Sequence, residues 1–291
     1  MNNTIGVMQG WLLPKYQGRY QAHPVGNWQD EFIVAREVGI DCIEFILDYN
    51  EAEDNPLIKE GGVEEIKIVV ERTGIAVKTI CADYFMEAPL HSEHIEIANS
   101  SQELMIRLLN NVAELGVTGV VIPCVDQSTL ADKPAVDRFF EVLLPIVVIA
   151  EKHGINLSLE TDLAPQLFIE LLERFNSNRV TVNYDIGNSA ALGYDLVEEL
   201  DYYGKRITDI HLKDRVLGGG PVELGKGDAD FYAFFNKLKE FDYQGPFIMQ
   251  AYRDEEGVEI FKKQLDWVKP YLNEWHYCYN SCTFRIKIFN R

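Results

Sequence analysis

Four side chains capable of binding a cation stand where short apolar runs of the sequence end. Glu160 closes LSLE, Asp185 closes VTVNYD, His211 lies near the end of ITDIHLKD, and Gln250 lies in FIMQAYR. Two carboxylates, an imidazole and an amide oxygen are suitable ligands for one divalent ion such as Mn²⁺, Mg²⁺ or Zn²⁺. Each residue alone is more often a helix cap or a loop hydrogen-bonder. Their recurrence at four consecutive run ends predicts a metal site.

A metal site of this kind favours proton transfer at a carbon next to a carbonyl. A divalent cation stabilises the enediolate by several kcal/mol, and a carboxylate at its edge removes the proton. Glu160 is the predicted base. Its role as a metal ligand would also keep it ionised.

Four further residues are candidates for binding substrate. Glu44 is expected either to contact the substrate or to hold a polar network at the same site. Lys213 and Arg215 carry charge close to His211 and are expected to orient a hydroxyl or a phosphate oxygen, with a loop salt bridge as the alternative. In the glycine-rich segment 215–231, Lys226 and neighbouring backbone N–H groups are candidates for binding a phosphate, although Lys226 is as readily a solvated loop lysine.

Strand-like runs alternate with stretches of helical period along the chain. Helix, glycine and strand recur in AREVGIDCIEF, VERTGIAVKTI, VAELGVTGVVI and AEKHGINLSLE. The pattern predicts strands at 5–10, 42–47, 77–83, 119–124, 157–160, 180–185, 207–214 and 247–253. It predicts helices at 28–38, 60–73, 93–114, 133–152, 165–175, 195–203, 229–240 and 257–272.

Eight such units indicate an α/β protein with a (β/α)8 TIM barrel, whose carboxyl-terminal mouth would gather the four strand-end residues. A doubly wound sheet is the alternative, but the first strand lacks the glycine-rich fingerprint that such sheets carry. We expect one barrel domain over 1–274. The basic and aromatic segment 275–291 forms a C-terminal extension whose structure the sequence does not decide between an edge strand, a dimer arm and disorder. A homo-oligomer is therefore possible.

The amino-acid composition indicates which classes of binding partner are compatible with this chain. With 27 basic and 46 acidic residues the formal net charge is −19, which disfavours nucleic acid and anionic membranes. A small anionic substrate remains compatible if the site supplies cations. The N-terminus lacks the features of a signal peptide, and the longest apolar run is too short to span a bilayer. Three of the five cysteines, Cys42, Cys81 and Cys124, lie in apolar runs. We therefore expect buried thiols in a cytoplasmic protein.

Several motifs resemble a known family. LSLETD, NYDIGN, DIHLKDR, PVELGKGDADF and QGPFIMQ resemble the xylose isomerase-like barrels, which include sugar-phosphate isomerases and epimerases. The opening IGVMQGWLLPKYQGRYQAHP, with WQDEF and DCIEFILD, is similar to the N-terminal part of the 3-epimerases that act on L-ribulose or L-xylulose 5-phosphate. The resemblance covers roughly residues 4–273.

The resemblance implies a metal-binding glutamate on strand 5 and another on strand 8, which move a proton on opposite faces of the sugar carbon. Glu160, Asp185 and His211 match the family pattern. Gln250 departs from it, because an amide can ligate metal but cannot act as an acid or base near pH 7. This departure leaves open a one-base isomerisation through Glu160, another lyase or isomerase reaction, or a barrel that binds without turnover.

The predicted function is therefore a metal-dependent isomerase or epimerase of a sugar or sugar phosphate, with Glu160 as base. The alternative is a sugar-binding barrel whose catalysis is impaired or absent because of Gln250. A metal-dependent endonuclease-like phosphoesterase fits less well. It would need more histidines at the mouth and a basic groove.

Overall fold

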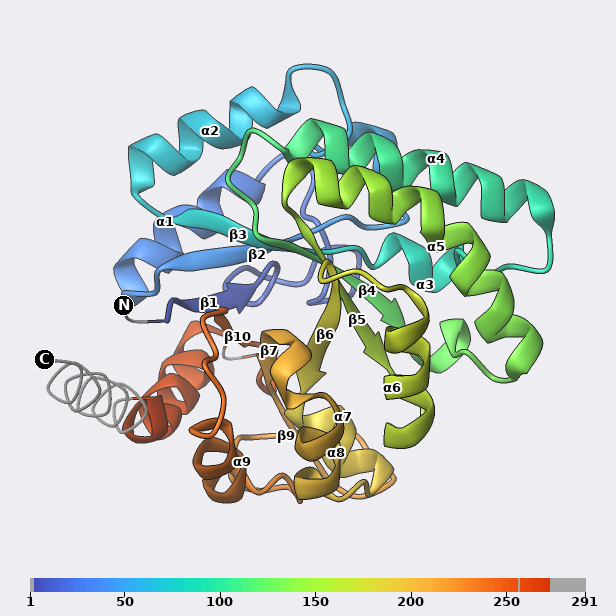
Figure 1. Cartoon of the computed structure of the whole chain (residues 1–291). Helices are drawn as coiled ribbons and strands as arrows, with labels where there is room; N and C mark the ends of the chain where they lie inside the picture. The colour runs from blue at the N-terminus through green and yellow to red at the C-terminus, as the bar shows by residue number, and fades with distance from the viewer. Residues whose placement is uncertain (1–2, 256, 273–291) are drawn as a thin grey trace, which may run out of the picture.

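Eight parallel strands close into a barrel in this computed structural model, which describes residues 3–255 and 257–272. The strands run through the centre of the molecule, with helices around them (Figure 1). Their order around the ring is β1-β10-β7-β6-β5-β4-β3-β2. They comprise β1 (Ile5–Met8), β2 (Cys42–Ile46), β3 (Ala76–Cys81), β4 (Gly119–Cys124), β5 (Asn156–Thr161), β6 (Val180–Asp185), β7 (Ile207–Leu212) and β10 (Phe247–Met249). The predicted (β/α)8 barrel is confirmed.

The outer helices follow the predicted spacing. They are α1 (Trp28–Val38), α2 (Gly62–Thr73), α4 (Ile95–Val112), α5 (Lys133–His153), α6 (Pro165–Arg174), α8 (Leu196–Tyr203) and α9 (Phe231–Leu238), followed by a helical segment at 258–272. The recurring glycines have the predicted role. Gly39, Gly74 and Gly154 end α1, α2 and α5 with φ of 82°, 77° and 72°, a conformation that glycine adopts without strain.

Several short elements were not predicted. Helix α3 (Tyr84–Glu87) follows β3, α7 (Ile186–Leu192) follows β6, and a two-stranded ribbon of β8 (Asp214–Arg215) and β9 (Pro221–Val222) follows β7. Three 3₁₀ turns, η1 (Ala52–Asp54), η2 (Asp126–Ser128) and η3 (Gly204–Arg206), complete the elements. These pieces span too few residues to show a hydrophobic period. Strand β10 is also shorter than the predicted 247–253.

The core has an apolar outer layer and a partly polar interior. Large side chains such as Phe32, Phe139 and Phe234 are fully buried, and each stabilises the fold by about 1.5–3 kcal/mol. By contrast, Glu44, Asp209 and several buried hydroxyl residues are polar groups on the barrel strands. Polar groups at such depth require internal partners.

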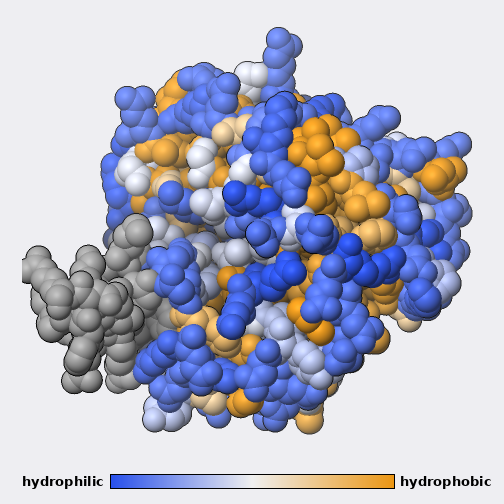
Figure 2. Space-filling model, viewed as in Figure 1, coloured by the Kyte–Doolittle hydropathy of each residue, from blue (hydrophilic) through white to orange (hydrophobic). Residues whose placement is uncertain are grey.

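The surface is largely hydrophilic on the face in view, with hydrophobic patches between (Figure 2). Within the described parts of the chain, no helix combines the length and apolarity needed to cross a membrane. Cys42, Cys81 and Cys124 are buried free thiols, as predicted. The proposed extension at 275–291, with Cys278 and Cys282, lies outside the described residues.

Candidate metal and active site

A cavity of about 590 Å³ lies over the carboxyl ends of the strands. Polar and charged side chains from the segments that follow most of the strands supply its lining. The lining residues are Arg19, Gln21, Asp48, Tyr49, Asn50, Asp83, Met86, Glu87, Pro123, Val125, Asp126, Gln127, Glu160, Asn188, Lys213, Arg215 and Gln250. Four of the eight predicted site residues are among them. This is the mouth at which barrel enzymes hold their active sites.

Three of the four predicted metal ligands meet next to this cavity, and Glu160 is the one of the three that lines it. The His211 Nδ1 atom lies 3.9 Å from Glu160 Oε2 and 3.9 Å from Asp185 Oδ2. One ligand atom from each residue lies within 4.8 Å of the others. Strand pairing explains part of this approach, because Asp185 and His211 are direct partners between β6 and β7. We call Glu160, Asp185 and His211 the mouth cluster.

The two oxygens of Asp185 are used differently. Oδ1 accepts a hydrogen bond from the backbone N–H of Asn188 at 2.8 Å and so caps α7. Oδ2 is buried and has no hydrogen-bond partner within the described residues, although Lys213 Nζ lies 3.5 Å away. A buried carboxylate oxygen without a partner is costly, and a bound cation would satisfy it. The residues present therefore fit a divalent metal ion.

Two asparagines that sequence analysis missed hold the carboxylate of Glu160. Asn188 donates from Nδ2 to Oε1 at 2.6 Å, and Asn183 donates from Nδ2 to Oε2 at 3.3 Å. Burial, then the charge of Asp185, raises the pKa of Glu160 to about 7. Both asparagines belong to NYDIGN, two residues before and three after Asp185. That spacing, which places Asn183 and Asp185 on one face of a strand, is the signal that could have identified Asn183.

His211 also takes part in a second, deeper group, which we call the interior cluster: Glu44, Asp209 and His211. His211 Nε2 lies 2.8 Å from Glu44 Oε1, and the Thr79 hydroxyl donates to Glu44 Oε2 at 2.6 Å. Burial, then the charge of Glu44, raises the pKa of Asp209 well above its ordinary value, which favours its protonated form. Burial opposes ionisation of Glu44, but the charge of His211 and the hydrogen bonds with His211 and Thr79 outweigh it and lower the pKa of Glu44.

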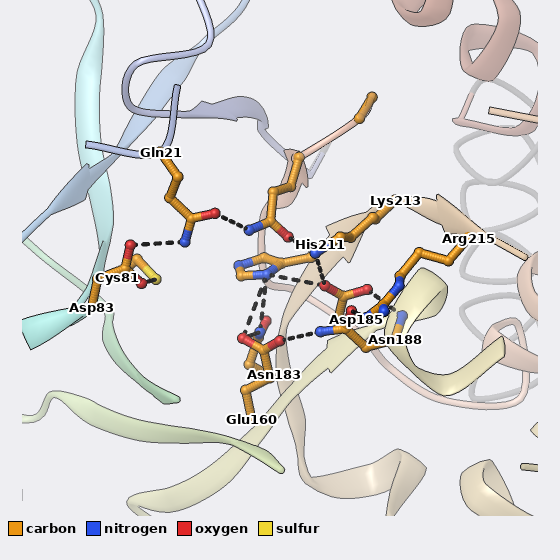
Figure 3. A network of polar contacts seen from close by, with 12 residues as sticks. Gln21, Cys81, Asp83, Glu160, Asn183, Asp185, Asn188, His211, Lys213 and Arg215 are labelled. Carbon is orange, nitrogen blue, oxygen red and sulfur yellow. Dashed lines mark hydrogen bonds and ion pairs between the residues drawn. The ribbon is translucent and has the colours of Figure 1, made fainter. Parts of the chain in front are cut away.

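Charges on both sides control the protonation of His211. Burial by itself lowers its pKa, but the charge of Glu44 and the hydrogen bond to it outweigh burial, and Glu160 adds to them, so the pKa rises to about 10. The Nε2–H group donates to Glu44, and Nδ1 faces Glu160 and Asp185 (Figure 3). Glu44 therefore aims Nδ1 at the predicted metal position.

The position of Glu44 bears on the two roles predicted for it. It is not among the described residues that line the cavity, and its side chain is fully buried on the far side of the His211 ring. The reason is its position in the middle of β2, whereas Glu160 lies near the end of its strand. Of the two predicted roles, its contacts support the polar network and not substrate binding.

Lys213 lies between Gln250 and Asp185 of the mouth cluster and contacts both. Lys213 Nζ donates to Gln250 Oε1 at 3.2 Å and lies 3.5 Å from Asp185 Oδ2. The Gln250 amide in turn donates to Gln21 Oε1 at 2.9 Å. Gln250 thus lies at the predicted cavity, and its role as a fourth ligand stays a prediction.

The two remaining candidates, Arg215 and Lys226, both lie in the loop after β7, but only Arg215 lines the cavity. Arg215 lines the cavity and donates to Asn188 Oδ1 at 2.8 Å and to Gly219 O. Lys226 lies outside the cavity lining, with 61% of its side chain exposed, and pairs with Glu223 at 2.8 Å. The alternative interpretation of Lys226, a solvated loop lysine, is therefore the one that its contacts support.

The backbone donors expected to bind phosphate are already occupied. Gly225 and Gly227 donate their N–H groups to Asp214 Oδ2 at 2.8 and 2.9 Å, and Ala229 donates to Oδ1 at 3.2 Å. A Cβ atom at Gly227 would lie 2.2 Å from the Asp214 carboxylate, so this position requires glycine. A carboxylate from the chain itself occupies the place predicted for an external anion.

Known proteins resemble this chain over most of its length. The model of the Xylose isomerase-like TIM barrel family matches residues 32–271. A putative L-ribulose-5-phosphate 3-epimerase SgbU of Haemophilus influenzae is 26% identical over 263 residues, covering 83% of this chain and 90% of that protein. The L-ribulose-5-phosphate 3-epimerase UlaE of Escherichia coli O1:K1 is 25% identical over 261 residues, covering 86% and 92%.

The fold is also found among solved structures. The apo form of the 3-keto-D-glucoside 4-epimerase YcjR of E. coli superposes with a TM-score of 0.72 at 19% sequence identity. The similarity covers 92% of this chain and 100% of that one. At this level of identity the comparison supports the barrel fold.

Proposed function

The chain belongs to the xylose isomerase-like TIM barrel family, and from that premise we propose that it is a metal-dependent epimerase or isomerase of a sugar or sugar phosphate. The observation that carries the proposal is the mouth cluster beside the polar cavity. It joins an oxygen that has no hydrogen-bond partner among the described residues, an imidazole nitrogen and a second carboxylate. The related proteins named as L-ribulose-5-phosphate 3-epimerases make L-ribulose 5-phosphate the first substrate to test.

Glu160, Asp185 and His211 would hold the metal ion, with Gln250 as a fourth ligand. When bound, the ion would neutralise negative charge that develops on the carbonyl oxygen of the substrate. Glu160 would remove the proton from the carbon next to that carbonyl. The hydrogen bonds from Asn183 and Asn188 fix the direction of the Glu160 carboxylate, which favours transfer at one face of the carbon.

Lys213 and Arg215 would bind the anionic or hydroxyl end of the substrate. Both line the cavity of a chain whose net charge is −19, so they provide local positive charge that an anion requires. Arg215 is held by Asn188, which also holds Glu160, and this shared contact would couple the substrate position to the base.

The experiment that tests the proposal measures proton exchange in D₂O. Purified protein with Mn²⁺ is incubated with L-ribulose 5-phosphate and with other pentulose and hexulose phosphates, and deuterium uptake is followed by NMR. We expect exchange that a chelator abolishes. Glu160→Gln should slow exchange by at least about a hundredfold, the usual scale of general base catalysis, with the thermal unfolding midpoint retained. Metal-independent exchange, or full activity of Glu160→Gln, would refute the proposal.

A second candidate is a sugar-binding barrel without turnover. Gln250 favours it, because an amide at this position cannot carry a proton. Binding of a ketose phosphate in the presence of metal, without deuterium uptake in any substrate, would favour this candidate.

We further propose that the protein works in the cytoplasm. The three buried free thiols are compatible with a reducing compartment. We also propose that the protein forms a homo-oligomer and that it has no nucleic-acid or membrane partner. Residues 275–291 would form a separate extension. Light scattering on the full chain, with and without residues 275–291, would test the oligomer and the role of the extension.

A further inference from the structure

Inversion at a carbon needs proton carriers on both of its faces, and Gln250 cannot be one of them. Five carboxylate side chains line the cavity: Asp48, Asp83, Glu87, Asp126 and Glu160. Asp48 pairs with Arg19 at 2.8 Å, and Glu87 and Asp126 are exposed to solvent. Besides Glu160, Asp83 is the remaining lining carboxylate: it is half-buried, and no cation pairs with it in the described structure.

The carboxyl group of Asp83 is fixed and faces the cavity. Asp83 follows β3 and takes the N-cap position of α3, yet its side chain makes no capping hydrogen bond. Instead Oδ2 accepts from Gln21 Nε2 at 2.8 Å, and Oδ1 accepts from the Cys81 thiol at 3.2 Å. The side chain is thus held by partners other than its own helix.

Gln21 joins Asp83 to the strand 8 position. Its Nε2 donates to Asp83, and its Oε1 accepts from Gln250 Nε2 at 2.9 Å. Figure 3 shows Asp83, Cys81 and Gln21 on one side of His211, and Asp185, Asn188 and Arg215 on the other. Asp83 therefore approaches the cavity from a different wall than Asn188, which holds Glu160, and it is one side chain away from Gln250.

Asp83 holds a proton more readily than an ordinary aspartate does. Burial raises its pKa to about 6, and the charges of Asp48 and Glu44 act in the same direction, against the hydrogen bonds from Gln21 and Cys81. An ordinary aspartate, with a pKa near 3.9, would be almost entirely ionised under these conditions. The charge of Asp83 also contributes to the raised pKa of Glu160, so the two carboxyl groups lie within electrostatic reach.

We propose that Asp83 is the second proton carrier of this site and makes the enzyme a two-base epimerase, with Gln21 and Gln250 as the residues that position it. The inference rests on the proposed function. Glu160 takes the proton as the C–H bond breaks, and the electron pair moves into the enediolate. A new C–H bond then forms with the proton of Asp83 on the opposite face. Nothing is oxidised or reduced, and the reverse reaction exchanges the two roles.

The test separates exchange from inversion. Wild type, Asp83→Asn and Glu87→Gln are incubated with Mn²⁺ and L-ribulose 5-phosphate, or whichever ketose phosphate shows exchange, in D₂O. NMR records deuterium in the remaining substrate and the amount of epimer. Glu87→Gln is the matched control, because it neutralises an exposed carboxylate on the same cavity. We expect wild type and Glu87→Gln to show both signals. Asp83→Asn should keep exchange within about threefold and lose epimer formation by at least about a hundredfold.

A second variant tests the positioning. Gln21→Met removes the hydrogen bonds to Asp83 and Gln250 while keeping a similar volume, and it should slow epimer formation more than exchange. Retained exchange in both variants serves as the measure of correct folding, together with the thermal unfolding midpoint.

The outcomes distinguish the two proposals. Exchange without epimer in wild type, epimer formation by Asp83→Asn at the wild-type rate, or equal loss of both signals in Asp83→Asn would overturn the role of Asp83 and leave the proposed function standing. Absence of exchange in wild type with every ketose phosphate would overturn the proposed function itself.

Discussion

The mouth cluster and the interior cluster share His211 and contain the same residue types, yet their surroundings differ. The mouth cluster adjoins the cavity and leaves Asp185 Oδ2 without a hydrogen-bond partner in the described structure. In the interior cluster, Glu44 is held by the Thr79 hydroxyl and the imidazole, whereas burial raises the pKa of Asp209, whose Oδ2 also has no hydrogen-bond partner among the described residues. A cation from solvent can reach the mouth cluster, whereas Glu44 and Asp209 are fully buried and do not line the cavity.

Depth along the strand explains the difference. Asp209 and His211 lie on the same strand two residues apart, about 6.6 Å along its axis, and point to the same side. That step separates the barrel interior, where a charge needs a permanent partner, from the mouth, where a ligand can supply one. Similar side chains therefore stabilise the barrel at the deeper position and are available to bind a metal ion at the mouth.

The largest expected effect comes from neutralising the mouth cluster. Asp185→Asn should abolish measurable metal binding and metal-dependent exchange, because the chain loses a charged ligand. The amide oxygen can still cap α7, so the free energy of unfolding of the metal-free protein should change by less than about 1 kcal/mol. Calorimetric metal titration and chemical denaturation measure the two quantities. Wild-type metal affinity in this variant would remove Asp185 from the site.

The matched change in the interior cluster should act mainly on stability. Glu44→Gln leaves His211 without its charged partner, so the metal-free protein should lose about 3–5 kcal/mol of unfolding free energy. Metal affinity should fall by about 10–100-fold, because the partner that orients the imidazole is weakened. Denaturation and titration under the conditions used for Asp185→Asn allow direct comparison. Equal stability of the two variants would contradict the assigned difference between the clusters.

The pH dependence of metal affinity should show how the interior cluster acts on the mouth cluster. Metal binding requires neutral His211 and ionised Glu160, whose pKa values are about 10 and about 7. Between pH 7 and 9 metal binding must displace the proton of His211, so metal affinity should rise by up to about tenfold per pH unit. Below pH 7 it must also displace the proton of Glu160, so the slope should be steeper. Glu44→Gln should flatten the dependence above pH 7, since Glu44 is the main charge that raises the pKa of His211.

Calorimetry in buffers of different ionisation enthalpy would count the released protons directly. An affinity that does not change between pH 7 and 9 would show that His211 is already neutral, or that it does not bind the metal.

The smallest effect is expected in the loop after β7, away from both clusters. Lys226→Ala removes only an exposed ion pair with Glu223, so exchange rate and substrate affinity should change by less than about twofold, and unfolding free energy by less than about 1 kcal/mol. Steady-state kinetics with the substrate found above measures this. A tenfold weaker binding of phosphorylated substrate would restore Lys226 as a phosphate ligand.

The sequence was sufficient for the barrel and for the nearness of Glu160, Asp185 and His211. Repeated helix, glycine and strand units define the topology, and parallel strands bring their carboxyl ends together. It left open two roles each for Glu44 and Lys226, which both lie outside the cavity lining in the described structure. Asn183 was missed although it lies two residues before Asp185 on β6. Asn188, Asp83 and Gln21 were missed because an isolated amide or aspartate beyond the strand ends has no pattern that separates it from ordinary capping residues.

By itself, then, the sequence determined which residues end the strands, because the alternation of apolar and polar positions is a local property of the chain. Only the tertiary structure decided how deep each side chain lies and which polar group it meets. Glu44 contacts His211, which lies 167 positions later in the sequence. Gln21 contacts both Asp83 and Gln250, which lie 62 and 229 positions away from it. Such contacts depend on barrel closure, which fixes the distance between residues that no local pattern relates.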